Sequence, residues 1–248
     1  MPKSKSTKTV IEGKLGTYPV TIYFERRNGG RASVGTKSLL LRVPYNLTKK
    51  GMGDLWSWFM DWVRQLEEER PDTLKHFHYK VYQSGMELVV GDRTYVLQID
   101  GDERRTATGK MVPPNELHLI LPTGMDNYNN NRAIKTLCSR LVAQDYLPAI
   151  KTRVQELNSA FFNKEIKDVK LKYNSSNWGS CSSNKIINFS TRLLFAPKVV
   201  VDYVIIHELA HLVEANHSSR FWALVEKAMP AYKEHEKWLK ENGKDCDF

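Results

Sequence analysis

Three histidines and a glutamate late in the sequence have types and spacings suited to metal chemistry. His207 and His211 stand four residues apart in the segment VVVDYVIIHELAHLVEANH, which runs from Val199 to His217. Residues four apart share one face of a helix, so both imidazoles can point at one ion about 2.0–2.1 Å from each nitrogen. Glu208 lies about a hundred degrees round the same turn, where it can take a proton from water on the ion without being an easy ligand. The pattern predicts a hydrolytic zinc site with separate ligands and base.

His217 provides a third imidazole if the helix ends before it. It stands six residues after His211, which is the wrong face of a continuous helix. Asn216 is a good left-handed terminator, and Ser218 can cap a following helix that ends before Pro230. A sharp turn at Asn216 would bring His217 back to the first two histidines and complete a three-histidine site with one open position, which is typical of catalytic zinc. If His217 is not the third ligand, the remaining candidates are Glu226, Glu234 and His235.

The helix predicted around these residues is apolar nearly all round. Between Val199 and Val213, the only polar side chains besides the histidines and Glu208 are Asp202 and Tyr203. Imidazoles and a carboxylate in such a helix need strong partners. A metal ion would be one, and the alternative is a histidine pair satisfied by backbone groups and water.

The segment from Asn177 to Trp222 resembles the YgjP-like metallopeptidase family, whose members are small gluzincin-like zinc hydrolases similar in appearance to the WLM and SprT-type proteases. The resemblance rests on a loop, a strand, the start of the zinc helix, that helix itself and the segment after it. Outside the helix, the matching residues are Trp178-Gly179-Ser180-Cys181-Ser182, Asn188, Arg192-Leu193, Pro197, Asn216-His217-Ser218 and Phe221-Trp222. It implies a zinc ion held by His207, His211 and His217, with Glu208 as catalytic base. Asn177 departs from the family, which usually has arginine before the tryptophan.

The loop before the zinc helix is expected to form a wall of the site. Asn174 to Asn177 have turn chemistry, and Trp178 is a large apolar anchor for an otherwise mobile polar loop. We expect the following residues to contact substrate: Trp178, Gly179, Ser180, Cys181 and Asn188. Cys181 is compatible with a nucleophile, a zinc-sensitive thiol or a small packed residue, and unpaired cysteine is usually packed.

Lys185 to Ser190 reads as a short strand beside this loop. We expect it to be an edge strand that pairs with an extended peptide substrate, although a plain core strand bearing Ile187 and Phe189 fits the same alternation. The residue that stabilises the oxyanion stays open among four candidates: Tyr203, Asn188, Tyr232 and His235.

Composition places the chain among globular proteins. Its 248 residues, 41% hydrophobic and 26% charged, can bury a substantial core in one large or two small units. Three cysteines suggest no disulfide framework and fit a reducing compartment. The start, MPKSKSTKTV, lacks the apolar core of a signal peptide, and no apolar run reaches membrane-spanning length. We therefore expect a cytoplasmic protein with no membrane association.

The net charge of +9 is concentrated at the beginning of the chain. Residues 1–50 contain eleven Lys or Arg against Glu12 and Glu25, while the remainder is balanced. Such a region suits nucleic acid, anionic lipid or an acidic partner, whereas solvated strand faces and a solubilising tail explain it more simply. We expect weak or no nucleic-acid binding.

The sequence predicts most of its strands in the first half of the chain and a helix-dominated second half. The expected strands are Thr9–Glu12, Tyr18–Phe24, Ser38–Val43, Met86–Val90, Thr94–Ile99, Glu116–Leu121 and Lys167–Tyr173. Helices are expected over Asp54–Arg70 and from about Arg132 to Phe161, and a loop over Gly101–Pro114. These elements predict an α+β fold: a disordered tail (1–8), a strand-rich N-terminal region (9–126), and a small helix-dominated, zincin-like catalytic domain with a short antiparallel sheet (127–248).

The function predicted from these residues is zinc-dependent hydrolysis of peptide bonds in a peptide or protein substrate. Two alternatives stay open. A metal-dependent nucleotide pyrophosphatase, an activity also attached to some members of the family that the chain resembles, would need phosphate-binding donors, and no Gly-rich phosphate loop occurs. A nucleic-acid-associated protease would use the basic first region for binding.

Overall fold

The chain folds into two compact units in the computed structural model, which describes residues 5–77, 81–103 and 105–248. The first unit comprises Met1–Val81 with Gly124–Arg132, and the second comprises Tyr82–Thr123 with Ala133–Phe248. Helices and strands are mixed in both, which confirms the α+β class. Among the described residues, no helix combines the length and apolar character needed to cross a membrane.

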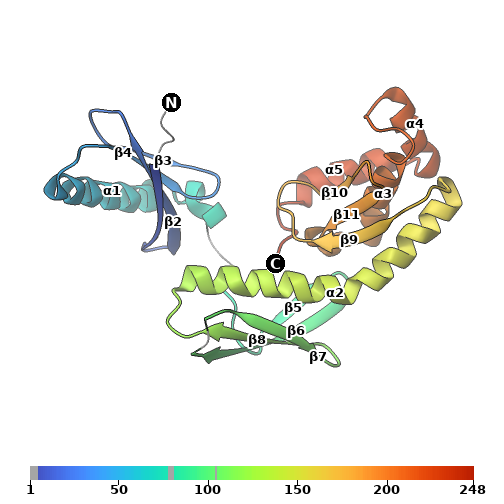
Figure 1. Ribbon diagram of the computed structural model, residues 1–248, viewed down its shortest axis with the longest axis horizontal. Coiled ribbons are helices and arrows are strands. Elements are labelled where there is room, and N and C mark those ends of the chain that lie inside the picture. The colour runs from blue at the N-terminus through green and yellow to red at the C-terminus, as the bar shows by residue number, and fades with distance from the viewer. Residues whose placement is uncertain (1–4, 78–80, 104) are drawn as a thin grey trace. The chain divides into compact units, whose positions relative to one another are not determined.

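The first unit is a four-stranded sheet with one long helix (Figure 1). In chain order its strands are β1 (Lys5–Glu12), β2 (Thr17–Glu25), β3 (Arg31–Val34) and β4 (Leu39–Pro44). They are arranged β1-β2-β4-β3, with β2 and β4 parallel and the other two pairs antiparallel. Helix α1 (Lys49–Glu69) and the 3-10 helix η1 (Pro71–Phe77) follow.

The two-residue period of β2 and β4 gives this unit its core. Alternate side chains of both strands face α1, and the fully buried ones include Tyr18, Val20, Leu39, Leu41 and, from the helix, Phe59. Helix α1 begins where the Thr48 side chain accepts a hydrogen bond from Gly51 N at 3.1 Å, and it ends before Pro71.

Two features of the first unit differ from the prediction. Lys5 to Lys8 pair with β2, so the predicted disordered tail over 1–8 does not hold for these four residues, and residues 1–4 lie outside the described part. Strand β3 was not predicted, because Arg31–Val34 carries only two apolar side chains and its extended form depends on pairing with β4.

The second unit begins with another four-stranded sheet. Its strands are β5 (Glu87–Val90), β6 (Arg93–Asp102), β7 (Thr108–Val112) and β8 (Glu116–Pro122), arranged β5-β6-β8-β7. Strand β7 lies in the predicted loop Gly101–Pro114, so that prediction is wrong there. Helix α2 (Asn127–Phe161) packs along this sheet (Figure 1), where Asp145 receives hydrogen bonds from Arg93 and Tyr95.

A smaller sheet and three helices complete the second unit. The strands β9 (Asp168–Lys172), β10 (Gly179–Cys181) and β11 (Ile186–Ser190) are arranged β10-β11-β9. The 3-10 helix η2 (Thr191–Phe195) leads to α3 (Lys198–Ala210), α4 (Ser219–Ala228) and α5 (Tyr232–Asn242). Because β11 pairs antiparallel with β10 but parallel with β9, the sheet is mixed and not wholly antiparallel as predicted.

One continuous core joins the two sheets of the second unit. Buried side chains of β6 and β8, of α2 and of α3 belong to the same cluster, among them Leu97, Leu119, Val142, Val154 and Val204. The strands of residues 87–122 therefore share a unit with the elements after 133. The predicted boundary between residues 126 and 127 separates these strands from that unit. Strand patterns in the sequence alone do not show which hydrophobic core a sheet joins.

Candidate metal centre

The helix predicted to carry the zinc ligands is α3, and it ends before His217, as the predicted role of His217 as third ligand requires. Its last helical residue is Ala210, and α4 begins nine residues later at Ser219. Ser218 caps α4 by accepting a hydrogen bond from Phe221 N at 3.4 Å. Asn216 makes the turn without a left-handed backbone, because its side-chain oxygen accepts from Ser218 N at 3.2 Å. The predicted break is present, although the predicted left-handed conformation is wrong.

This turn brings three imidazoles together. His207, His211 and His217 each offer a ring nitrogen within 4.8 Å of the others, and no other group of three potential metal-ligating residues occurs in the described part of the chain. Nε2 of His207 lies 3.0 Å from Nε2 of His217. Two nitrogens bound to one zinc ion at about 2.0–2.1 Å are at most about 4.2 Å apart, so this pair already has a suitable separation.

The surroundings favour neutral imidazoles that can act as ligands. Burial lowers the pKa of His207 to about 4, helped by the neighbouring His211 and His217, and burial also lowers the pKa of His211. His211 Nδ1 donates to the Glu214 carbonyl at 3.2 Å, which leaves its Nε2 for the cluster. Metal binding requires neutral histidine, and three nitrogen donors suit zinc. The residues therefore fit a zinc ion.

Glu208 lies beside this cluster, closely packed against strand β10. It is 5% exposed, and its Oε2 has no hydrogen-bond partner among the described residues. A Cβ atom at Gly179 would come within 2.5 Å of Glu208 Oε1, so only glycine leaves room for this carboxyl. Burial raises the pKa of Glu208 to about 8. A carboxyl group in such an environment is a candidate for proton transfer.

The pleat of β10 divides the predicted substrate-binding residues between two faces. Gly179 faces Glu208, and Cys181 shares that face. Ser180 and Asn188 are paired across the strands and face the other way, 3.5 Å apart between Asn188 Nδ2 and Ser180 Oγ. The structure therefore brings Gly179 and Cys181 to the centre but not the side chains of Ser180 and Asn188.

Cys181 has the chemistry of a packed thiol. It packs against the main core of the second unit. Burial, followed by the charge of Glu208, raises its pKa to about 11. Because the thiolate is the reactive form, this environment disfavours a nucleophilic role.

Trp178 is fixed to the fold by Arg192. The Arg192 guanidinium lies 4.6 Å from the centre of the Trp178 ring and donates to the carbonyls of Ser175, at 3.0 Å, Cys246, at 2.8 Å, and Gly243. One arginine thus ties the loop before β10 to the segment after α5. In the sequence, Arg192 stands out only as part of the motif, since an arginine after a strand gives no signal for such a role.

Aromatic side chains line one side of the histidines. The Phe221 ring is 4.5 Å from that of His211 and 4.9 Å from that of His207. Beyond it, Trp222 stacks on Tyr232 at 5.3 Å, and Tyr203 lies 6.1 Å from His207. His235 is 6.4 Å from Tyr203. Of the four candidates for oxyanion stabilisation, three therefore gather beside the centre, and Asn188 is the exception.

The chain matches one protein family and is similar to parts of solved structures. The YgjP-like family, described as "YgjP-like, metallopeptidase domain", matches residues 31–242. Among solved structures, the chain is similar to the metallopeptidase zymogen abylysin of Pyrococcus abyssi, with 23% identity over 37% of this chain and 93% of that chain and a TM-score of 0.34. It is also similar to the metallopeptidase zymogen jannalysin of Methanocaldococcus jannaschii. The identity is 21% over 37% of this chain and 94% of that chain, and the TM-score is 0.34. No curated protein matches the chain.

Proposed function

Because the chain belongs to the YgjP-like metallopeptidase family, we propose that it hydrolyses peptide bonds with a zinc ion held by His207, His211 and His217 and with Glu208 as general base. The observation that carries this proposal is the convergence of three ring nitrogens within 4.8 Å beside a buried carboxyl. Bound zinc supplies a Lewis acid that polarises a carbonyl and lowers the pKa of water toward about 7.

Glu208 moves the proton in this proposal. It takes a proton from the attacking water and delivers it to the leaving nitrogen of the scissile peptide bond. Burial raises the pKa of Glu208 to about 8 in the absence of a metal ion, and a zinc ion bound beside it would favour the charged form that accepts the proton. Close packing against Gly179 fixes where the carboxyl group lies, and the Glu214 carbonyl orients the His211 ring.

The strand that pairs with substrate must differ from the predicted one. Strand β11 is central, with β10 on one side and β9 on the other, so its backbone groups are already paired. Of the two edge strands, β10 and β9, it is β10 that lies against the candidate base, because its Gly179 faces Glu208. We therefore assign substrate pairing to the free edge of β10, where an extended peptide would pass beside the general base.

Metal analysis tests the ligand assignment. Purified protein is expected to contain about one zinc ion per chain, and His207→Ala, His211→Ala and His217→Ala are expected to lose it. His118→Ala is the matched control, because His118 contacts Glu116 on the other sheet. Zinc content equal to that of the wild type in all three variants, or a wild type that takes up no zinc from a stoichiometric supply, contradicts the assignment.

An activity screen separates peptidase from pyrophosphatase. The zinc-loaded protein is expected to cleave a mixture of unfolded proteins and to leave nucleoside triphosphates intact. The Glu208→Gln variant, measured beside it, identifies any contaminating peptidase. Release of pyrophosphate that depends on Glu208, with no peptide cleavage, would overturn the peptidase proposal.

A further inference from the structure

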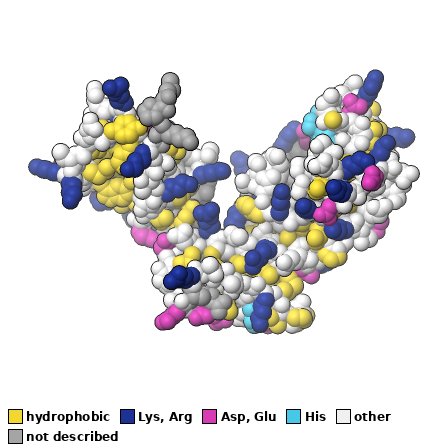
Figure 2. All heavy atoms as spheres, in the orientation of Figure 1, with side chains coloured by type: hydrophobic (Ala, Val, Ile, Leu, Met, Phe, Trp, Pro, Cys, Tyr) yellow, Lys and Arg dark blue, Asp and Glu magenta, His cyan; other side chains and the backbone are white. Residues whose placement is uncertain are grey.

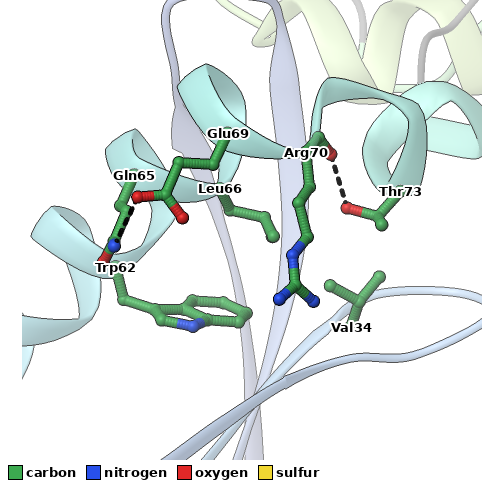
Figure 3. Close-up of a pocket in the computed structure, with 7 residues that line it drawn as sticks. All are labelled: Val34, Trp62, Gln65, Leu66, Glu69, Arg70 and Thr73. Atoms are coloured by element: carbon green, nitrogen blue, oxygen red, sulfur yellow. Dashed lines mark hydrogen bonds between the residues drawn. The ribbon is translucent and has the colours of Figure 1, made fainter.

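The first unit has a groove that plays no part in the metal centre. The groove has a volume of about 460 Å³ and lies between α1, β3 and the start of η1 (Figure 3). Trp62 and Leu66 of α1 and Val34 of β3 line it, and Arg70 reaches in from the end of the helix. Thr73 and two further side chains of α1, Gln65 and Glu69, complete the lining, and the Gln65 amide donates to the Glu69 carboxylate at 2.8 Å. We call it the α1–β3 groove.

Helix α1 and strand β3 contact each other at two points. The Leu55 side chain of α1 packs closely on Gly30, which precedes β3. Farther along both elements, Val34 of β3 and Leu66 of α1 line the groove together.

Strand β3 leaves backbone groups free along this groove. It is the last strand of its sheet and pairs only with β4 among the described strands. The Gly35 N–H donates to the Ser38 carbonyl at 3.0 Å, which identifies Gly35 and Ser38 as a hydrogen-bonded pair. Because such pairs alternate in an antiparallel ladder, the N–H and C=O groups of Ala32 and Val34 point away from β4. An incoming strand could pair with them.

The side chains around the groove specify the chemistry of such a strand. The Trp62 indole and Val34 offer apolar contacts, and the Arg70 side chain extends between them (Figure 3). Arg70 is exposed, and no described residue forms an ion pair with it. Hydrophobic side chains also gather on the visible face of this unit, with Lys and Arg side chains around them (Figure 2). An apolar residue next to a carboxylate would complement this groove.

We propose that the α1–β3 groove docks an extended polypeptide that adds to the edge of β3, places apolar side chains against Trp62 and pairs an acidic group with Arg70. The site goes beyond the proposed catalytic function, because every residue that lines it belongs to the first unit. A peptide fits better than a nucleic acid, since the outward groups of β3 alternate between N–H donors and C=O acceptors, which match a peptide backbone and not a row of phosphate acceptors.

A peptide-binding titration of the full chain tests this proposal. The glutamate probe is a short fluorescent peptide in which every second residue, on one face of the extended chain, is leucine or glutamate in turn. The residues on its other face are threonine. A second peptide, the lysine probe, has lysine at each glutamate position. Glu208→Gln serves as the background, so that a peptidase does not consume the probe. Anisotropy is expected to show saturable binding of the glutamate probe and at least about tenfold weaker binding of the lysine probe.

Two variants locate the bound peptide. Arg70→Glu removes the proposed partner of the acidic group, and Ala32→Pro removes an outward N–H from the edge strand, a position where proline is tolerated. Each is expected to weaken binding about tenfold. Arg64→Glu is the matched control, because it makes the same charge change on the exposed side of α1 and leaves the groove intact. Circular dichroism melts verify that every variant is folded.

The outcomes separate this site from the metal centre. Absence of binding by the glutamate probe overturns the proposal, as does an equal loss in Arg70→Glu and Arg64→Glu, which would indicate unspecific attraction. Displacement of the probe by a single-stranded oligonucleotide would instead favour nucleic acid as the occupant. None of these results depends on zinc or on hydrolysis, so the groove can fail while the proposed peptidase activity stands.

Discussion

Two glutamates, one in each unit, are equally buried but differently surrounded. Glu67 in α1 and Glu208 in α3 are both 5% exposed. Glu67 Oε1 accepts hydrogen bonds from the Tyr18 hydroxyl and from Leu15 N, each at 2.8 Å. The carboxyl group of Glu208 receives no hydrogen bond from any residue that the structure describes, and it lies beside three imidazoles.

The difference indicates what each carboxyl group contributes. Glu67 links the β1–β2 turn to the helix that covers the sheet, so it belongs to the fold of the first unit. Glu208 has no such structural link, and burial without donors raises its pKa to about 8. A buried carboxyl group without hydrogen-bond donors destabilises the fold unless another group or a proton compensates, and such groups are concentrated at functional sites.

The largest expected effect is that of Glu208→Gln on hydrolysis. The amide cannot accept a proton, so the rate should fall by at least about two to four orders of magnitude. Because no described donor loses its acceptor, zinc content and the melting temperature should stay at the values of the wild type. Unchanged hydrolysis in this variant contradicts the role of Glu208, and simultaneous loss of zinc indicates direct coordination.

Gly179→Ala tests whether the position of the Glu208 carboxyl matters. The new Cβ would come 2.5 Å from Glu208 Oε1 and would displace the carboxyl group. A shift of about 1 Å can cost about a hundredfold in rate, and we expect a loss of that size in kcat with zinc retained. Gly29→Ala is the control, since nothing lies within 4 Å of a Cβ at that position. Full activity in Gly179→Ala would show that the tight contact is not needed.

Glu67→Leu should have the opposite signature. It leaves the Tyr18 hydroxyl and the Leu15 N–H without their acceptor, which should lower the free energy of unfolding by about 1–3 kcal/mol. Zinc content and peptide hydrolysis at a temperature below the transition should not change. Denaturant unfolding measures the change in the free energy of unfolding. Loss of peptide hydrolysis in the folded Glu67→Leu variant would contradict a purely structural role of Glu67.

The smallest expected effect is that of Tyr18→Phe, which removes one of the two donors to Glu67 and should cost about 1 kcal/mol of unfolding free energy. Burial, followed by the bond to Glu67, raises the pKa of Tyr18. The folded state therefore keeps the Tyr18 proton more tightly than the unfolded state, and stability falls as the pH rises above about 10, the ordinary tyrosine pKa. The advantage of the wild type over Tyr18→Phe should be constant near neutral pH and shrink in that alkaline range.

Sequence reasoning went furthest where local spacing determines geometry. The break after His211 follows from helical periodicity and from the capping serine, Ser218, and the structure has both. The roles of these residues as zinc ligands stay a prediction that metal analysis must test. Alternation also correctly indicated strands over much of both units.

The remaining differences concern long-range pairing. Strand β11 looks the same in sequence whether it is central or at an edge, because its period reports only the alternation of its own side chains. The separation of Gly179 from Ser180 onto opposite faces was within reach of sequence reasoning, since neighbours in a strand always point apart. The link from Arg192 to Trp178 was not, because it joins segments that only the fold brings together.

The metal centre also has a consequence for the order in which the chain acquires its parts during synthesis. All three histidines lie between His207 and His217, whereas both segments of the first unit, including the α1–β3 groove, lie before residue 133. A ribosome makes the N-terminal segments first, and domains generally fold as units in that order. The growing chain would therefore contain every residue of the α1–β3 groove well before it contains the three histidines.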